Sequence, residues 1–173
     1  KLLKDGALTL NPQFEWAGGG YATTAGDLAR FVHQQFGDGG IGTALRAEVT
    51  DGVDAPQLGP GTRYGLCCIV KSGPLGTTLG HSGFFPGYVS DARWFEDSRL
   101  TVVVQVNTSD FARLGKGTGW MAHELARVVL DPAATLELPK RRDILPRSIL
   151  TKREVERLLA APDATTPLGL RDR

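Results

Sequence analysis

The stretch Gly80-His81-Ser82-Gly83-Phe84-Phe85-Pro86-Gly87-Tyr88-Val89-Ser90 holds the features that decide the fold of this chain. It combines a histidine, a hydroxyl and a glycine with Pro-Gly, a dipeptide typical of tight turns. Because glycine has no side chain, it leaves a strand backbone open to close approach by another molecule. Beyond the turn, residues 88–95 alternate between two faces, as a strand does. We therefore expect an antiparallel hairpin whose backbone can be approached before its turn.

Further strands are predicted on both sides of this hairpin. Residues 64–70 are rich in strand-forming residues, and residues 72–76 turn the chain toward a strand that begins at Thr77. Residues 96–99 form a four-residue turn into residues 100–106. That last run is almost continuously apolar, which suits a central strand covered on both faces.

Helices are predicted before and after the strands. Thr24 and Asp27 form a capping pair at the start of the first helix, which ends at Gly37 and has an apolar face made of Leu28, Phe31, Val32 and Phe36. A short helix is expected around residues 43–49. The last helix ends at Asp131-Pro132, and its apolar face consists of Met121, Leu125, Val128 and Val129. Antiparallel strands followed by a helix that can lie on them predict an α+β fold, an antiparallel sheet packed by helices.

Composition divides the chain near residue 140. Hydrophobic residues make up 41% of the chain, enough for a core, and a net charge of +1 argues against a nucleic-acid or membrane partner for the chain as a whole. Residues 1–139 carry a net charge of −3 and 21 of the 22 glycines, whereas residues 140–173 carry a net charge of +4. We predict a linker over residues 139–150 and a C-terminal helical extension over residues 151–173.

The termini and the cysteines give little information about the compartment. No apolar run approaches the roughly 20 residues that span a bilayer, and the first residues do not form a signal segment. Since the chain begins with Lys1 and its only methionine is Met121, we expect the natural start to lie upstream. Cys67 and Cys68 are adjacent in a strand-like run that points them to opposite faces, so we expect two buried thiols and no disulfide between them.

Three segments together resemble a known family. They are residues 18–31 (Gly-Gly-Gly-Tyr-Ala-Thr-Thr-Ala-Gly-Asp-Leu-Ala-Arg-Phe), the His81-Ser82-Gly83 stretch, and residues 100–107 (Leu-Thr-Val-Val-Val-Gln-Val-Asn). In this order and spacing they resemble the C-terminal half of the penicillin-recognising serine hydrolases, which include class C β-lactamases, D-alanyl-D-alanine carboxypeptidases and related esterases. The resemblance covers residues 1–138 and implies part of a β-lactamase/transpeptidase-like fold.

The resemblance also implies roles for several residues of the stretch 80–90. Such sites combine a Ser-x-x-Lys nucleophile, a Tyr-x-Asn or Ser-x-Asn motif and a Lys-Thr-Gly-type strand. His81-Ser82-Gly83 stands in the place of the third element, in a form with histidine for lysine. The backbone N–H of Phe84 would be an oxyanion donor, His81 and Ser82 would orient the substrate, and Tyr88 would lie at the rim.

The first two elements are absent from this sequence. No serine is followed three residues later by lysine, and Tyr21, Tyr64 and Tyr88 have no asparagine two residues on. Without a nucleophile the covalent route is closed, so we expect this polypeptide alone to be inactive as a hydrolase. In the complete enzyme the substrate would be a β-lactam, a D-alanyl peptide or an ester. That family is often exported, but this chain shows no export signal.

Other interpretations of the polar residues remain open. A strand-end His-Ser-Gly is also common as a plain turn. His33 and His123 are expected to be structural, and Trp94 and Trp120 to pack in the core. No pair of histidines with a carboxylate has metal-ligand spacing, so no metal or other cofactor is expected.

Residues 145–173 resemble a second family. The Leu150-Thr151 helix start with Glu154-Val155 and the final Gly-Leu-Arg-Asp-Arg run, residues 169–173, are similar to the opening of a tyrosine-recombinase (phage-integrase-type) catalytic domain. That family's catalytic arginine, histidines and tyrosine come later, so Arg171 and Arg173 are not assigned to them. The alternative is a generic capped basic helix.

These resemblances divide the chain into residues 1–138, the linker 139–150 and the recombinase-like segment 151–173. They suggest a junction of two partial domains, and they leave a DNA-recombination fragment or a DNA-binding module led by the basic tail as the second function. A partial sheet should also expose apolar surface and an unpaired strand edge, so we expect self-association.

Overall fold

The computed structural model describes residues 3–4, 7–37, 40–131 and 133–134. The chain divides into two compact units, Asn11–Lys140 and a second unit made of Lys1–Leu10 with Arg141–Arg173. In the second unit the described residues form a short antiparallel ladder of β1 (Leu3–Lys4) and β2 (Ala7–Leu8). The predicted linker and the recombinase-like segment lie outside the described residues.

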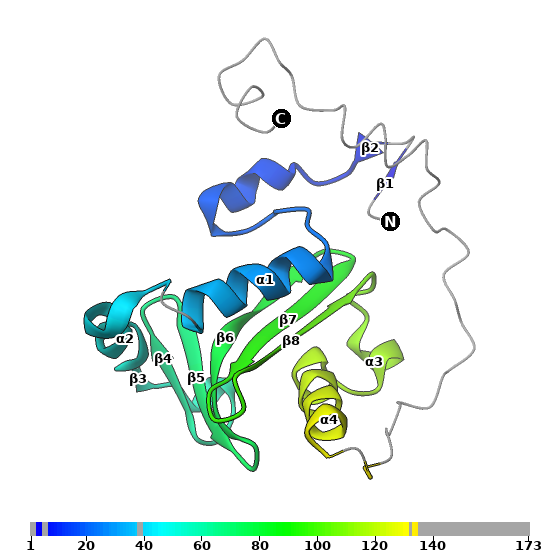
Figure 1. Cartoon of the computed structure of the whole chain (residues 1–173). Helices are drawn as coiled ribbons and strands as arrows, with labels where there is room; N and C mark the ends of the chain where they lie inside the picture. The colour runs from blue at the N-terminus through cyan, green and yellow to red at the C-terminus, as the bar shows by residue number, and fades with distance from the viewer. Residues whose placement is uncertain (1–2, 5–6, 38–39, 132, 135–173) are drawn as a thin grey trace. The chain divides into compact units, whose positions relative to one another are not determined.

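The unit Asn11–Lys140 is built on a six-stranded antiparallel sheet in the order β3-β4-β5-β6-β7-β8 (Figure 1). The α+β prediction of an antiparallel sheet packed by helices is therefore confirmed. The strands are β3 (Val53–Asp54), β4 (Thr62–Gly65), β5 (Cys68–Gly73), β6 (Gly76–Phe85), β7 (Tyr88–Phe95) and β8 (Leu100–Val106).

Each long strand is joined to the next by a short hairpin. Pro86-Gly87 connects β6 to β7, and the φ of 92° at Gly87 is the left-handed conformation that the second central residue of a type II turn requires. Residues 96–99 connect β7 to β8, as predicted.

One predicted strand is broken in two. Residues 64–70 were expected to form a single strand, but Leu66-Cys67 is a turn between β4 and β5, and Cys67 has a φ of 54°. The turn exposes Cys67 while Cys68 is buried, so the expectation of two buried thiols is wrong for Cys67. Both cysteines are free, as expected.

Helix α1 (Ala25–Phe36) begins where the capping pair predicted. Thr24 Oγ1 accepts a hydrogen bond from the Asp27 N–H at 3.1 Å and donates to the Asp27 carboxylate at 2.6 Å. Val32 and Phe36 are buried, but Phe31 is 60% exposed and does not belong to the inward face. The remaining helical segments of this unit are η1 (Pro12–Gly18), α2 (Gly42–Thr50), η2 (Pro56–Leu58), α3 (Phe111–Leu114) and α4 (Thr118–Leu130).

Helix α4 packs through small residues rather than through its large apolar ones. Its buried residues are Thr118, Ala122 and Ala126, spaced one turn apart. Leu125 is 38% exposed and Val129 is 61% exposed, so the predicted apolar face is wrong for both. Alanine lets the helix axis come close to the sheet, and the larger side chains are then displaced to the outer side.

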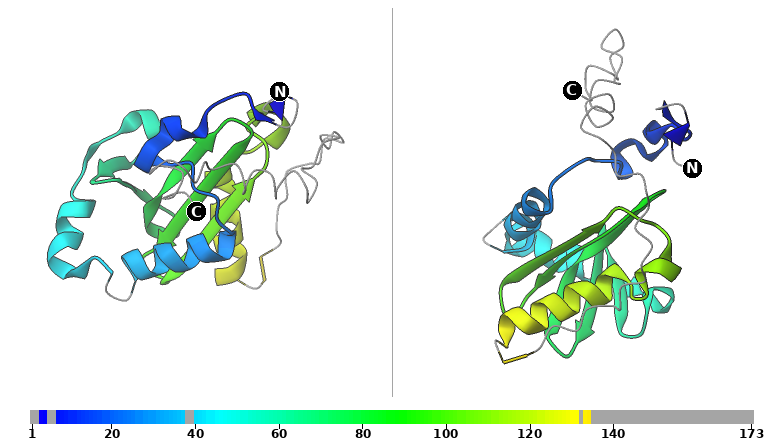
Figure 2. Two further views of the ribbon diagram at one scale, coloured as in Figure 1. Left: turned by 90° about the horizontal axis from the view of Figure 1, so that it is seen from above. Right: turned by 90° about the vertical axis from the view of Figure 1, so that its right-hand side faces the viewer.

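The sheet has a core on each face. Leu79, Ala92 and Trp94 lie in the core with Val32 and Phe36 of α1. On the other face, the core consists of Phe95 and Val102 with Ala122 and Ala126 of α4. Figure 2 shows α1 and α4 on opposite sides of the sheet. Trp94 is only 2% exposed, which confirms its predicted place in the core.

Strand β8 was expected to be central, but it lies at the end of the sheet order. Its apolar character is explained by the two helices, since both α1 and α4 contact it. An edge strand that is covered on both faces has the same sequence pattern as a central one. Among the described residues, no helix is long and apolar enough to cross a membrane.

Candidate functional site

The candidate site lies where strand β6 extends beyond the end of its neighbour β5. Pairing between these strands ends at Ile69 opposite Gly80, whereas pairing of β6 with β7 continues to Phe85 opposite Tyr88. Within the described residues, the segment 81–85 therefore has a strand on one side only. Its other side is an open edge that lies beside the β4–β5 turn.

Gly80 allows β6 to lie this close to β7. A Cβ atom built at Gly80 would collide with the backbone carbonyl oxygen of Ala92 on β7. Any side chain at this position would therefore push the two strands apart. A glycine immediately before His81 is thus required for the hairpin that carries the candidate site.

The hairpin geometry determines which backbone groups point to the open edge. A two-residue hairpin such as Phe85-Pro86-Gly87-Tyr88 closes on a hydrogen-bonded pair, and hydrogen-bonded and non-hydrogen-bonded pairs alternate along an antiparallel ladder. Phe84 opposite Val89 and Ser82 opposite Asp91 are then non-hydrogen-bonded pairs. The N–H groups of Ser82 and Phe84 consequently point away from β7, toward the edge where β5 has ended.

His81 is exposed and is held in one orientation by two contacts. Its Nδ1 lies 2.5 Å from the backbone carbonyl oxygen of Ser82, and its Nε2 lies 2.8 Å from the hydroxyl of Tyr64 on β4. The two rings meet edge to face, with centroids 5.8 Å apart and an interplanar angle of 84°. Because a carbonyl oxygen can only accept, Nδ1 carries the hydrogen, so in the neutral ring Nε2 accepts from the Tyr64 hydroxyl.

Ser82 and His81 do not present their side chains to the same space. Successive residues of a strand point to opposite faces, so the Cβ atoms of His81 and Ser82 leave the strand on opposite sides of the sheet. The two residues meet at the open edge, where the imidazole of His81 contacts the backbone carbonyl of Ser82. The Ser82 side chain is exposed.

The rest of the predicted stretch surrounds this edge. A Cβ at Gly83 would overlap the Ser90 hydroxyl on β7, and a different Ser90 rotamer would relieve that overlap. The Phe84 side chain is 60% exposed and stacks on Phe111, with ring centroids 6.3 Å apart. Tyr88, the predicted rim residue, is 41% exposed and pairs with Phe85 at the end of the hairpin.

A buried ion pair lies behind Ser82 on the α4 face. Arg93 Nε contacts Asp91 Oδ1 at 2.5 Å and Arg93 Nη2 contacts Asp91 Oδ2 at 3.1 Å. The two side chains are only 10% and 3% exposed, and Arg93 Nη1 has no hydrogen-bond partner. Asp91 Oδ2 is also close to Gly119, in the first turn of α4. This pair lies on β7, which backs the candidate site, near the start of α4.

The other two histidines lie outside this site, as the sequence suggested. His33 of α1 meets Trp94 edge to face, with centroids 5.1 Å apart. His123 of α4 meets Phe95 in the same way at 5.3 Å. Burial lowers the pKa of His123, and the positive charges of Lys71 and Arg93 lower it further. In the described residues, no cluster of three or more His, Cys, Asp or Glu side chains could hold a metal ion.

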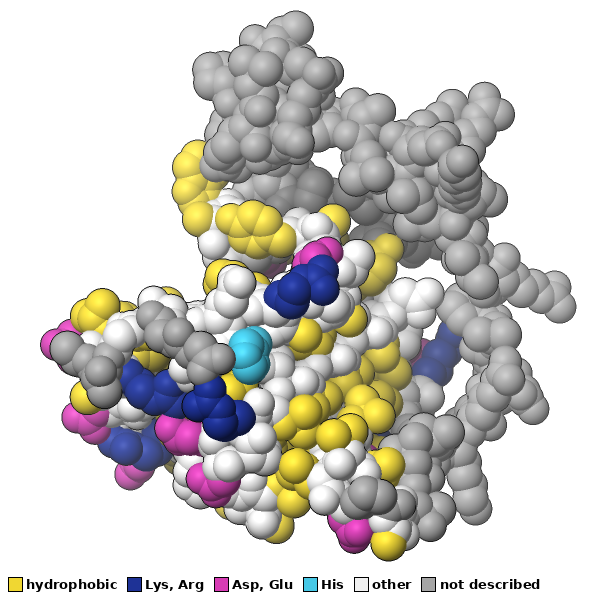
Figure 3. Space-filling model, in the orientation of Figure 1, with side chains coloured by type: hydrophobic (Ala, Val, Ile, Leu, Met, Phe, Trp, Pro, Cys, Tyr) yellow, Lys and Arg dark blue, Asp and Glu magenta, His cyan; other side chains and the backbone are white. Residues whose placement is uncertain are grey.

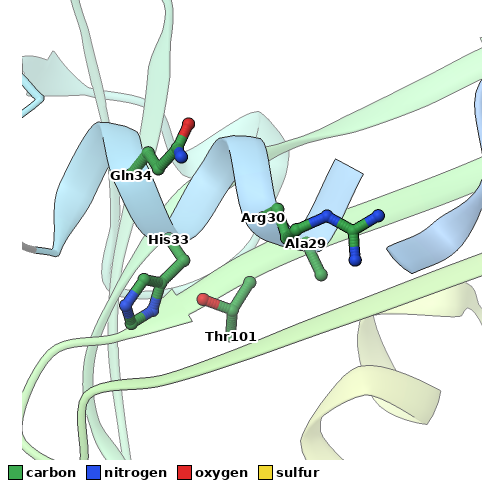
Figure 4. Close-up of a pocket in the computed structure, with 5 residues that line it drawn as sticks. All are labelled: Ala29, Arg30, His33, Gln34 and Thr101. Carbon is green, nitrogen blue, oxygen red and sulfur yellow. The ribbon is translucent and has the colours of Figure 1, made fainter. Parts of the chain in front are cut away.

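A shallow depression of about 350 Å³ lies away from β6, between α1 and β8 (Figure 4). Its lining consists of Ala29, Arg30, His33, Gln34 and Thr101. It borders the end of the sheet rather than the open edge of β6. We therefore do not include it in the candidate site.

Tyr64 is the one candidate site residue that the sequence did not indicate. It is separated from His81 by 17 residues and lies on a different strand. Tyr64 has no asparagine two residues on, so no sequence motif marks it as a site residue. Its contact with His81 depends on the turn at Leu66-Cys67, which the sequence did not reveal.

Comparison with solved structures gives a likeness in fold. The chain is similar to the crystal structure of a D-stereospecific amidohydrolase from Streptomyces sp., with 26% sequence identity and a TM-score of 0.51. The match covers 57% of this chain and 29% of the amidohydrolase chain.

Comparison with curated proteins gives a different likeness over shorter stretches. The chain is 50% identical over 54 residues to tyrosine recombinase XerC 2 of Ralstonia nicotianae, and 51% identical over 43 residues to tyrosine recombinase XerD of Xanthomonas campestris pv. campestris. These matches span 15% and 13% of the length of the two recombinases. No protein-family model matches the chain.

Proposed function

We propose that residues 1–138 form the C-terminal part of a serine hydrolase of the β-lactamase and D-amidohydrolase type, and that β6 is its substrate-binding wall. The observation that carries the proposal is the open edge of residues 81–85, with the Phe84 N–H directed outward beside an oriented imidazole. The likeness in fold to a D-stereospecific amidohydrolase supports the same assignment. The substrate class is a β-lactam, a D-alanyl peptide or an ester.

The chemistry that these residues serve is acyl transfer. A serine hydroxyl loses its proton to a base and attacks the substrate carbonyl carbon, and the carbonyl oxygen becomes an oxyanion. The oxyanion then collapses, the C–N or C–O bond to the leaving atom breaks, and the leaving atom takes up the proton, which gives an acyl-enzyme. A backbone N–H fixed in a strand suits the oxyanion, because its dipole is already oriented before the charge develops. Phe84 supplies such a donor at the open edge.

His81 serves to position the substrate rather than to activate a nucleophile. The Tyr64 hydroxyl occupies Nε2 and the Ser82 carbonyl occupies Nδ1. When the imidazole is protonated, Nε2 also carries a hydrogen, and it can then donate to a substrate carboxylate or carbonyl at the open edge in place of the Tyr64 contact. Tyr64 thus holds the ring in place until the substrate arrives.

This chain alone should bind such substrates without becoming acylated, because it contains no Ser-x-x-Lys sequence. The test is to incubate the full chain with benzylpenicillin and to measure both binding by calorimetry and covalent attachment by intact-mass spectrometry. We expect weak, reversible binding and no added mass. A mass increase of one penicillin would show that a nucleophile exists in this chain and would refute the proposal.

Two substitutions of Phe84 distinguish the contribution of its backbone N–H to binding from that of its side chain. Phe84→Pro removes the N–H, and proline is tolerated where a strand N–H faces away from its neighbour. We expect it to weaken binding about tenfold, the effect of losing one hydrogen bond to a charged group. Phe84→Ala keeps the N–H and removes the ring, and should leave the affinity within about threefold. Equal losses in both variants would contradict the role of the N–H.

A second candidate function is DNA binding by the basic tail, which the two recombinase likenesses favour. Residues 140–173 carry a net charge of +4. Binding of the full chain to duplex DNA should then weaken steeply with salt. The double substitution Lys152→Gln with Arg153→Gln should reduce the salt slope by about 2, and Arg113→Gln should not change it. An unchanged slope in the double variant would exclude the tail as the binding element.

A further inference from the structure

The hairpin between β6 and β7 turns at Pro86-Gly87, and this turn is not of the type that best suits a two-residue hairpin. Types I′ and II′ are favoured there because their twist matches that of the strands, and both require a positive φ at the first central residue. The ring of Pro86 fixes that φ at about −65°. Gly87, at the second central position, has a φ of 92°, so the turn is of type II. Turns of types I and II splay the strands that they join, so this hairpin needs support from outside the turn.

Ser109, in the segment between β8 and α3, provides that support. The Gly87 N–H donates a hydrogen bond to Ser109 Oγ at 2.9 Å, and this bond is partly buried and joins residues that are 22 positions apart in the chain. Type I and type II turns differ by a flip of the peptide between the two central residues, which reverses the direction of this N–H. The Ser109 hydroxyl therefore favours the type II form, because a flipped peptide would direct the Gly87 N–H away from it.

The same segment also contacts the residue that bears the candidate donor N–H. The Phe111 ring, at the start of α3, stacks on the Phe84 ring with an interplanar angle of 16°. The segment has internal hydrogen bonding of its own, since Thr108 Oγ1 accepts a hydrogen bond from the Asp110 N–H at 3.1 Å. The chain that follows β8 thus contacts the hairpin both at its turn, through Ser109, and at Phe84.

The position of Phe84 depends on the turn because its own backbone makes no ladder hydrogen bonds. Phe84 and Val89 are a non-hydrogen-bonded pair, and β5 has already ended at this point. Figure 3 shows hydrophobic side chains gathered over the sheet between α1 and α4. Apolar packing of this kind is not directional, so it does not select one orientation of a turn peptide. The hydrogen bond from Gly87 to Ser109 is directional and can select it.

We propose that Ser109 is a positioning residue of the candidate site: its hydroxyl holds the Pro86-Gly87 turn in the type II form and thereby sets the position of the Phe84 N–H. Ser109 acts through the turn and not through contact with the substrate. A flipped turn would change the twist between β6 and β7 and displace the edge formed by residues 81–85. This inference rests on the proposed function, because it assigns to Ser109 a part in the binding of the same substrate.

The first test measures the binding of benzylpenicillin to the full chain and to its variants by calorimetry. Ser109→Ala removes the acceptor, so part of the molecules should adopt the flipped turn, and the apparent affinity falls with the fraction that keeps the binding form. We expect binding to weaken about fivefold, the factor that corresponds to one ordinary hydrogen bond. Ser109→Thr keeps a hydroxyl at this position and should bind almost as well as the unsubstituted chain.

Thr24→Ala is the matched control for a general loss of stability. Thr24 Oγ1 also accepts a hydrogen bond from a backbone N–H, that of Asp27 at 3.1 Å, but this bond lies in the first turn of α1. Its removal should lower the free energy of unfolding about as much as Ser109→Ala does and should leave the affinity unchanged. Urea unfolding of both variants provides the comparison. A loss of affinity in Ser109→Ala alone would then report on the position of the binding edge and not on stability.

The second test examines the turn without any ligand, by nuclear magnetic resonance of the full chain. In Ser109→Ala the Gly87 amide should exchange its hydrogen with solvent faster than in the unsubstituted chain, and the Phe84 amide signal should shift because the edge has moved. Ser109→Thr should restore both the slow exchange of Gly87 and the signal position of Phe84.

Weaker binding in Ser109→Ala, with recovery in Ser109→Thr and faster exchange at Gly87, supports the proposal. Unchanged affinity in Ser109→Ala overturns it and leaves the proposed function intact, as does unchanged exchange at Gly87. An equal loss of affinity in Ser109→Thr or in Thr24→Ala also overturns it, because the Ser109 hydroxyl would then not be the cause. If the unsubstituted chain binds no benzylpenicillin, the proposed function fails and this inference fails with it.

Discussion

Replacing Asp91 by alanine would remove the only hydrogen-bonding partner described for the Arg93 guanidinium, which is 10% exposed and already has one nitrogen without a partner. Breaking a buried ion pair from one side leaves an uncompensated charge away from water and typically costs about 3–5 kcal/mol. That is a large part of the 5–15 kcal/mol that holds a typical domain folded. We therefore expect Asp91→Ala to lower the free energy of unfolding by about 3–5 kcal/mol, or to prevent folding.

Urea unfolding followed by tryptophan fluorescence, to which the buried Trp94 contributes, provides the measurement. Asp51→Ala is the matched control, because the Asp51–Arg63 pair has a similar N···O distance of 3.0 Å but side chains that are 82% and 45% exposed. This control should cost less than about 1 kcal/mol. Replacing both members, Asp91→Leu with Arg93→Met, should recover most of the loss, since no charge is then left unpaired.

Equal costs for Asp91→Ala and Asp51→Ala would refute the reasoning. That result would mean that water reaches the Arg93 guanidinium. Failure of the double variant to recover stability would have a different meaning. It would show that the pair contributes through its shape, and not through charge compensation.

Three further predictions follow from single features of the structure. Burial lowers the pKa of His123 below its usual 6.5, so unfolding takes up a proton as the pH falls below that value; stability should therefore be fully present above pH 6.5 and decline below it, and His123→Gln should flatten this decline in urea titrations at several pH values. In the native protein, Cys67 should react rapidly with a thiol reagent and Cys68 slowly, because burial raises the pKa of the Cys68 thiol; two equally fast thiols before denaturation would contradict the described turn. Thr24→Ala should destabilise the protein by about 1 kcal/mol through loss of the α1 cap, and Thr23→Ala by less than about 0.5 kcal/mol; equal thermal shifts would argue against the cap.

Local signals in the sequence were sufficient for much of the fold. Pro86-Gly87 and residues 96–99 placed the two hairpins, and the capping pair at Thr24 placed the start of α1. Each of these features depends on residues that are close together in the chain. The alternation along residues 88–95 also put Asp91 and Arg93 on the same face, where the structure pairs them.

What the sequence did not predict depends on contacts between distant residues. Leu66-Cys67 contains neither glycine nor proline, and the local mark of the turn that separates β4 from β5 is Gly65, directly before it, which alone did not outweigh the strand-forming residues on both sides. The contact of Tyr64 with His81 follows from that turn. The inward face of α4 was assigned to large apolar residues, but close packing on the sheet selected Ala122 and Ala126 instead.

Strand β8 illustrates a limit of pattern reasoning. Because α1 and α4 cover both faces of β8, its sequence is as apolar as that of a central strand. The apolar pattern therefore does not reveal the position of β8 in the strand order. The roles predicted for Ser82, Gly83 and Tyr88 depend on a bound substrate and remain predictions. Their places around the open edge can be described from the structure, but their contributions to binding have to be measured.

The backbone amide signal of Phe84 during a titration with benzylpenicillin, followed by nuclear magnetic resonance, tests the central claim most directly. If residues 81–85 form a substrate-binding edge, this signal should shift progressively and saturably, together with that of Ser82, while the mass of the protein stays unchanged. A Phe84 amide that does not respond while signals elsewhere shift would contradict the account.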